Sequence, residues 1–137
     1  MNRNLGVLSI IGASIFFLSL SSCKKENKCE AGSGGGVNVT ARLLHHDVLI
    51  PNDSLRPDTV WIKYNAIDWA SAPSGYDARF IGEFGEDHVH INGLKCGDYY
   101  FYASGWDSNI SEVVRGGRSL SFNQGTGEIP LEIFVTE

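Results

Sequence analysis

The chain has 137 residues, of which 16 are acidic and 11 basic, so its net charge is −5. This balance argues against a nucleic-acid partner, which clustered Lys and Arg would bind. The length suits one domain with a single core. The 16 glycines, the 11% of aromatic residues and the scarcity of helix formers after residue 30 are typical of short strands joined by turns.

The first 22 residues combine one positive charge, Arg3, with an uncharged apolar run over residues 5–20. The run ends in Ser21-Ser22-Cys23 and a charged stretch follows at once, so the segment resembles a bacterial lipobox. The resemblance implies that residues 1–22 are a signal peptide, which is cleaved, and that Cys23 is lipidated and anchors the protein to a membrane. The alternative is an uncleaved anchor, since about 20 apolar residues span a bilayer.

Residues 24–36 carry charges and then Gly and Ser, a composition that predicts a flexible linker. We therefore expect the lipidated cysteine and linker over residues 23–36 and a folded domain over residues 37–137. Cys29 and Cys96 can form a disulfide, because an exported protein meets an oxidising compartment. The alternative is two unpaired thiols.

The domain region shows the two-residue alternation of half-buried strands, and no segment after residue 23 has the period of a helix. About seven short strands predict an all-β fold, a single β-sandwich. One of the expected elements is a hairpin over residues 111–122 that turns at Gly116-Gly117. The other strands are expected around residues 37–43, 60–64, 78–84, 89–91, 99–104 and 131–135.

The stretch Gly93-Leu94-Lys95-Cys96-Gly97-Asp98-Tyr99 resembles the x-Leu-x-x-Gly-x-Tyr signature of prealbumin-like sandwiches, a group that includes carboxypeptidase regulatory-like and Cna-B-like domains. Residues 129–135 are similar to the last strand of these domains. Together with the lipobox, the chain resembles the small lipoproteins of Bacteroidota. The resemblance implies a prealbumin-like sandwich at the cell envelope, at the outer membrane, that binds or scaffolds an envelope protein or glycan.

All four histidines fall in two pairs, His45-His46 and His88-x-His90. Residues two apart on a strand project from one face, about 6–7 Å apart, so His88 and His90 can hold one metal ion. Zinc or copper suits imidazole ligands. His45 and His46 point to opposite faces of a regular strand, so only one can join unless a bulge lies there. The alternative to a metal site is that His88 and His90 are solvated residues on an exposed strand face. Further ligands are available from Asp47, Asp87 or Cys96.

Exposed aromatic rings can stack on sugars or anchor proteins. Trp69 and Trp106 lie in turn-rich stretches next to Asp, so we expect them in a ligand-binding site, with Asp107 accepting hydrogen bonds from sugar hydroxyls. The alternative is that these rings pack against the edges of the core.

A third kind of site is a modification. Asp53-Ser54-Leu55 and Asp58-Thr59-Val60 resemble the Asp-Ser/Thr-aliphatic acceptor for O-glycans in exported Bacteroidota proteins. Ser54 and Thr59 are therefore candidate O-glycosylation sites.

Catalytic motifs do not stand out in the sequence. It has no Gly-x-Ser-x-Gly nucleophile motif, and the glycines of residues 32–36 lack the Lys and helix of a phosphate loop. We therefore expect a non-catalytic protein without a cofactor, unless zinc or copper binds. Binding or scaffolding at the envelope is the first interpretation. Metal binding through His88 and His90 is the second, and glycan binding is the third.

Overall fold

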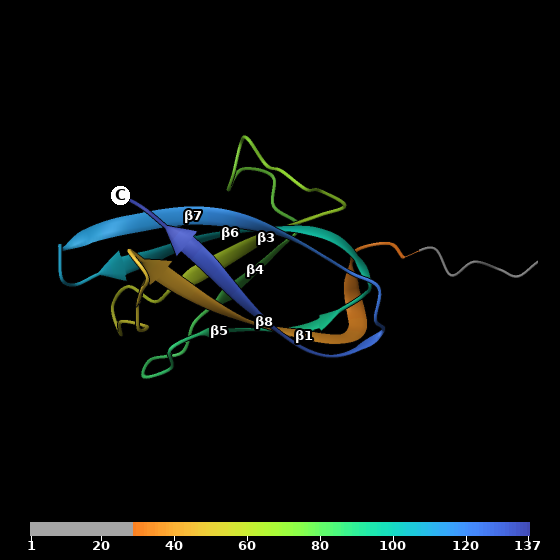
Figure 1. Ribbon diagram of the computed structural model, residues 1–137, viewed down its shortest axis with the longest axis horizontal. Helices are drawn as coiled ribbons and strands as arrows, with labels where there is room; N and C mark the ends of the chain where they lie inside the picture. The colour runs from red at the N-terminus through yellow and green to blue at the C-terminus, as the bar shows by residue number, and fades with distance from the viewer. Residues whose placement is uncertain (1–28) are drawn as a thin grey trace, which may run out of the picture.

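The computed structural model describes residues 29–137, so the predicted signal peptide and the lipidation of Cys23 lie outside the described residues. The described chain forms β1 (Ser33–His45), β2 (Val48–Leu49), β3 (Thr59–Tyr64), β4 (Ala78–Ile81), β5 (Val89–Leu94), β6 (Gly97–Asp107), β7 (Glu112–Phe122) and β8 (Thr126–Val135). They form two four-stranded sheets packed on a common core (Figure 1). The expected all-β sandwich is confirmed, with eight strands rather than about seven. A helix able to span a membrane is not found within residues 29–137.

β1 is the strand on which the first sheet is built. Its alternating Val37, Val39, Ala41 and Leu43 are buried, as a period of two requires. β8 runs parallel to β1 along one edge, from the pair Gly36↔Thr126 to the pair His45↔Val135. Because that edge is occupied, the antiparallel partners β5 and β2 share the other edge.

The second sheet has the order β4-β3-β6-β7, with every neighbour antiparallel. The inward residues Tyr99, Phe101 and Ala103 of β6 are fully buried against the first sheet. The two sheets are also joined by backbone. Arg115 of β7 and Thr136, just beyond β8, exchange N–H···O bonds of 2.7 and 2.8 Å. These bonds close one side of the sandwich.

Gly116 and Gly117 do not form the expected hairpin turn. They lie inside β7, paired with Ala103 and Tyr102 of β6, and the turn before β7 comes at residues 108–111. A Cβ on Gly116 would overlap the Phe134 backbone of β8, and one on Gly117 would meet the Tyr100 ring. The glycine pair therefore permits close approach of neighbouring chains rather than a change of direction.

The chain is already ordered within the stretch expected to be a flexible linker. β1 begins at Ser33, and Ser33 and Val37 both pair with Leu94, so residues 34–36 form a bulge. A Cβ on Gly35 would overlap the Leu94 backbone. This glycine run serves a bulge, and the boundary expected at residue 36 is corrected, because residues 29–36 belong to the domain.

Cys29 and Cys96 form a disulfide, with their Cα atoms 5.1 Å apart. The segment after Cys29 is held by the Tyr99 hydroxyl, which accepts from Gly32 N at 2.9 Å and donates to Lys95 O at 2.6 Å. Lys95 N donates in turn to Gly32 O at 2.9 Å. The disulfide therefore ties the start of the domain to the turn between β5 and β6. A link across 67 residues also restricts the unfolded chain, which contributes about 4 kcal/mol in the chain-entropy picture.

Asp58 is a carboxylic acid inside the domain, next to the start of β3. It is 1% exposed, and within residues 29–137 neither of its carboxylate oxygens has a hydrogen-bond partner. Its backbone is paired, because Asp58 N donates to Asn52 Oδ1 at 3.0 Å and Gly82 N donates to Asp58 O at 2.8 Å. Loss of hydration raises the pKa of the Asp58 carboxyl from 3.8 to about 7.

This burial makes the domain less stable as the pH rises. Between the ordinary pKa of 3.8 and about 7, the unfolded chain loses the Asp58 proton while the folded chain keeps it, so the free energy of unfolding decreases. Above that range the loss is complete, up to about 4 kcal/mol. We expect Asp58→Asn to raise the free energy of unfolding most at pH 8 and only by about a quarter of that amount at pH 4.5, where the loss has just begun, measured by urea denaturation. Equal stabilities of the two proteins at pH 8 would contradict this account.

Candidate metal centre

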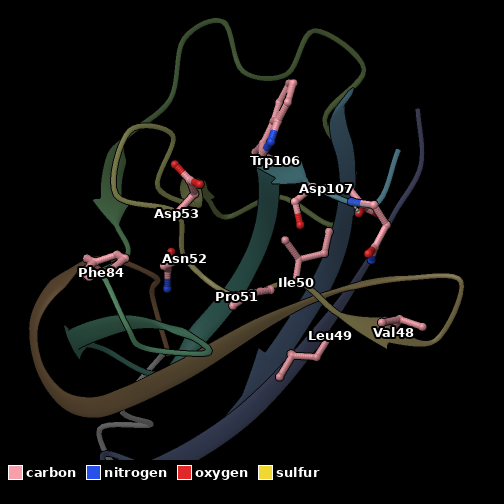
Figure 2. Close-up of a pocket in the computed structure, with 11 residues that line it drawn as sticks. Val48, Leu49, Ile50, Pro51, Asn52, Asp53, Phe84, Trp106 and Asp107 are labelled. Atoms are coloured by element: carbon pink, nitrogen blue, oxygen red, sulfur yellow. Dashed lines mark hydrogen bonds between the residues drawn. The ribbon is translucent and has the colours of Figure 1, made fainter. Parts of the chain in front are cut away.

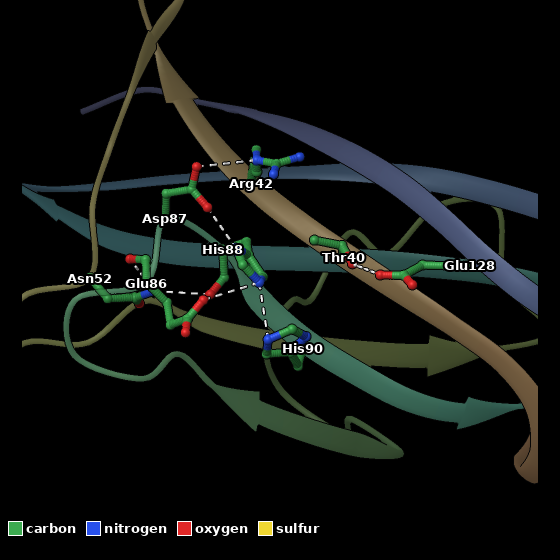
Figure 3. Close-up of polar contacts among 8 residues, drawn as sticks. All are labelled: Thr40, Arg42, Asn52, Glu86, Asp87, His88, His90 and Glu128. Atoms are coloured by element: carbon green, nitrogen blue, oxygen red, sulfur yellow. Dashed lines mark hydrogen bonds and ion pairs between the residues drawn. The ribbon is translucent and has the colours of Figure 1, made fainter.

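His88 and His90 lie on the outer face of the first sheet, at the start of β5. Val89 and Ile91 are fully buried, so the alternation turns both histidines away from the core. Their Nε2 atoms face each other at 3.0 Å (Figure 3). The two imidazoles therefore offer ring nitrogens to the same point.

Glu86 supplies a third donor atom at this point. Its Oε2 lies 3.3 Å from His88 Nε2, and the ligand atoms of Glu86, His88 and His90 all lie within 4.8 Å of one another. Two donors held by one tetrahedral zinc ion at about 2.0–2.1 Å are about 3.3 Å apart. The distances from His88 Nε2 to His90 Nε2 and to Glu86 Oε2 are close to this value, so these donors can share one ion after a small adjustment of the Glu86 side chain.

Asp87 orients the ring of His88. Asp87 Oδ1 lies 2.6 Å from His88 Nδ1, and Oδ2 lies 3.6 Å from Arg42 Nε on β1 (Figure 3). The hydrogen bond from His88, together with the charge of Arg42, lowers the pKa of the Asp87 carboxyl, so Asp87 acts as an ionised acceptor. His88 Nδ1 therefore carries a proton, and in the neutral ring the Nε2 lone pair points to His90 and Glu86. Metal-ligating histidines usually donate their second ring N–H to a carboxylate, a backbone carbonyl or a water.

Three donor atoms this close together favour a bound cation, either a proton or a metal ion. Two imidazole nitrogens and one carboxylate oxygen, if all unprotonated, present lone pairs to one another and repel. A proton on His90 can bridge the two rings, whereas a metal ion can satisfy all three groups. The place is open to an ion from solvent, because the Glu86 side chain is 42% exposed.

Asn52 fixes the segment that carries Glu86 and His88. It is 4% exposed, and its Nδ2 donates to Glu86 O at 3.1 Å and to His88 O at 3.0 Å. Its Oδ1 accepts from Asp58 N at 3.0 Å. A Cβ on Gly82 would overlap the Asn52 side chain, so glycine there makes room for it. The segment before β5 is therefore held in place by protein groups alone.

Sequence reasoning missed both Glu86 as a ligand and Asn52 as the residue that positions it. A signal for Glu86 exists, because Glu86-x-His88-x-His90 has the spacing that places three side chains on one face of an extended chain. Asn52 lies 34 residues before Glu86, and only the fold brings the two together.

The other histidine pair does not join this site. His45 ends β1 and is buried, with Nδ1 2.7 Å from Asp107 Oδ2 of β6 and Nε2 2.9 Å from Glu137 Oε2. The hydrogen bond to Asp107 raises the pKa of His45, against the opposing effect of burial. His46 is the first residue of the turn to β2, and its ring lies 4.2 Å from that of His45. Neither His45 nor His46 joins the His88 site, because the two histidine pairs belong to separate donor groups. Cys96 is not an available ligand either, because it is in the disulfide.

Trp106 and Asp107 line a cavity of about 140 Å³ next to the turn between β1 and β2 (Figure 2). Ligand pockets usually measure about 300 Å³ or more, so this cavity is small for a sugar. The Arg56 guanidinium lies 3.4 Å from the centre of the Trp106 ring, and Asp107 accepts from His45 and from Asn109 N. Arg56 therefore covers one face of the Trp106 ring and Asp107 is engaged by protein groups, and the glycan interpretation stays a prediction.

Trp69 lies apart from this cavity. It is half-buried, its Nε1 donates to Ser74 O at 3.1 Å, and its ring meets Tyr102 edge-on at 6.3 Å. Trp69 and Trp106 are therefore not brought together in one site, and Trp69 packs against the second sheet.

The two candidate O-glycosylation sites differ in access. Ser54 is exposed in a turn where Asp53 Oδ1 accepts from Leu55 N at 2.8 Å and from Arg56 N at 3.1 Å. Thr59 is half-buried at the start of β3, with its hydroxyl 3.4 Å from Pro57 O. O-glycosylation stays a prediction, and Ser54 is the better candidate because it is more exposed than Thr59.

Comparisons of the chain with protein families, with curated proteins and with solved structures give no match.

We expect Asn52→Ala to destabilise the domain by about 2–4 kcal/mol, because His88 O and Asp58 N lose their buried partner. Chemical denaturation measures the effect. Asn92→Ala is the matched control, because Asn92 is exposed on β5, and it should leave the stability within about 0.5 kcal/mol of wild type. A wild-type stability for Asn52→Ala would show that Asn52 does not hold this segment.

Proposed function

We propose that this protein binds a divalent transition-metal ion, zinc or copper, through Glu86, His88 and His90. One observation carries the proposal: three donor atoms converge within 4.8 Å of one another, and Asp87 holds His88 in the tautomer that a ligand needs. Of the three roles expected from the sequence, metal binding is the one that the contacts of the described residues support best.

The donor set indicates the class of metal. Imidazole nitrogens suit zinc and copper, whereas calcium and magnesium prefer ligands that are all oxygen. Three protein ligands leave a fourth position of a tetrahedral ion for water or for a donor from another molecule. We assign binding rather than hydrolysis, because the carboxylate of Asp87, next to His88 in the sequence, is engaged by His88 and Arg42 and is not free to act as a base.

The location at the cell envelope, with a lipid anchor at Cys23, is part of the same proposal. The lipobox-like segment supports it, and a disulfide between Cys29 and Cys96 suits an oxidising compartment outside the cytoplasm. The prealbumin-like relationship is also a proposal, in keeping with an all-β sandwich. In this interpretation a short tether holds a metal-binding domain at the outer membrane, where it binds or passes on zinc or copper.

Calorimetric titration of the purified full chain in detergent with zinc, at pH 7.5, tests the proposal. We expect His88→Ala to remove one equivalent of tightly bound zinc, since it deletes the nitrogen that the other two donors face. Asp87→Asn should weaken the same equivalent by about 10- to 100-fold, because it deletes the partner of Nδ1.

Glu83→Gln is the matched control, because Glu83 is an exposed carboxylate of the same loop that lies outside the ligand group, and it should bind zinc as wild type does. The same stoichiometry and affinity in wild type and His88→Ala would overturn the proposal. In that case the two histidines share a proton rather than a metal ion.

A further inference from the structure

We propose a second metal site, formed by His45, His46 and Glu137 at the end of the sandwich. Their ligand atoms all lie within 4.8 Å of one another. The site uses none of the residues of the first one, so it goes beyond the proposed function and can be tested independently of it.

The second site repeats the arrangement of the first. At His88, an aspartate binds Nδ1, and a glutamate and a second histidine lie at Nε2. At His45, Asp107 Oδ2 lies 2.7 Å from Nδ1 and Glu137 Oε2 lies 2.9 Å from Nε2. His46 is the second histidine. Asp107 also accepts from Asn109 N at 2.8 Å, so it is a fixed acceptor that leaves the neutral His45 ring with its Nε2 lone pair toward the other donors.

The backbone adopts an uncommon conformation that brings His46 to this point. His46 and Asp47 have φ angles of 48° and 63° in the turn between β1 and β2, a turn in which Asn and Gly are preferred. In a regular strand His46 would point to the face opposite His45. The left-handed turn places the two rings 4.2 Å apart instead, so the strained residue is one whose side chain joins the cluster.

Charge and access also suit an ion here. With neutral imidazoles, the carboxylates of Asp107 and Glu137 bring two negative charges, which a divalent cation balances. His45 and Asp107 are buried, whereas the Glu137 side chain is 57% exposed, so the glutamate can adjust around an ion that enters from solvent. The competing arrangement is a metal-free clamp, in which a protonated His45 lies between two carboxylates.

Zinc titration of a His88→Ala/His90→Ala variant of the full chain separates these possibilities. One equivalent of zinc should remain bound in this variant. Adding His46→Asn should weaken that equivalent at least tenfold, because one ligand is lost, and Asn tolerates the left-handed backbone. Asp47→Asn in the same background is the matched control, because it removes a charge from the same turn outside the ligand group. Glu137→Gln is a second test at an exposed position.

If the wild-type protein binds zinc and the His88→Ala/His90→Ala variant does not, the second site is overturned and the first one stands. Residual binding that neither His46→Asn nor Glu137→Gln weakens would overturn it as well. The first site fails in a different way: the His88→Ala/His90→Ala variant would then bind as many zinc ions as the wild-type protein does.

Discussion

β1 is hydrogen-bonded along both of its edges, and this pairing fixes which way the side chains near the two candidate sites point. Its inward positions form part of the core and end in His45, while the outward Arg42 reaches Asp87. A slip of one residue would turn Arg42 inward and His45 outward. The long parallel pairing with β8, and the bulge at residues 34–36 opposite Leu94, hold the register. The register of one strand therefore underlies both candidate sites.

Protein contacts hold the backbone that carries Glu86 and His88, and they orient the His88 ring. Asn52 binds the backbone on both sides of Asp87, and Asp87 binds the ring of His88. Fixed donors bind an ion with little loss of conformational freedom, which favours affinity. When neither a proton nor an ion lies between them, the two imidazole nitrogens and the Glu86 oxygen repel one another at these distances. That repulsion is the physical reason for expecting a cation between them.

The alternation of apolar residues was enough to predict the all-β sandwich, because each buried strand repeats with a period of two, as Val37 to Leu43 and Tyr99 to Ala103 do. The glycines misled the prediction at two places. Glycine serves turns, bulges and close contacts equally well, and only the neighbours of Gly35 and Gly117, namely Leu94 and Tyr100, tell these uses apart.

The candidate metal site was predictable only in part. His88 and His90 follow from strand spacing, and Glu86 could have followed from the same rule. Asn52 and Arg42 could not, because their contacts with the loop depend on how distant segments pack. The separation of His45 from His88 also depends on the fold, since the two residues face opposite sides of one sheet.

The most direct test of the central claim is an anomalous difference map, measured at the zinc absorption edge, from crystals of the protein grown with zinc. The account predicts a peak about 2.0–2.2 Å from His88 Nε2, His90 Nε2 and a Glu86 carboxylate oxygen, with Asp87 still bonded to His88 Nδ1. A map without a peak at that point, with the two Nε2 atoms still facing each other, would contradict it.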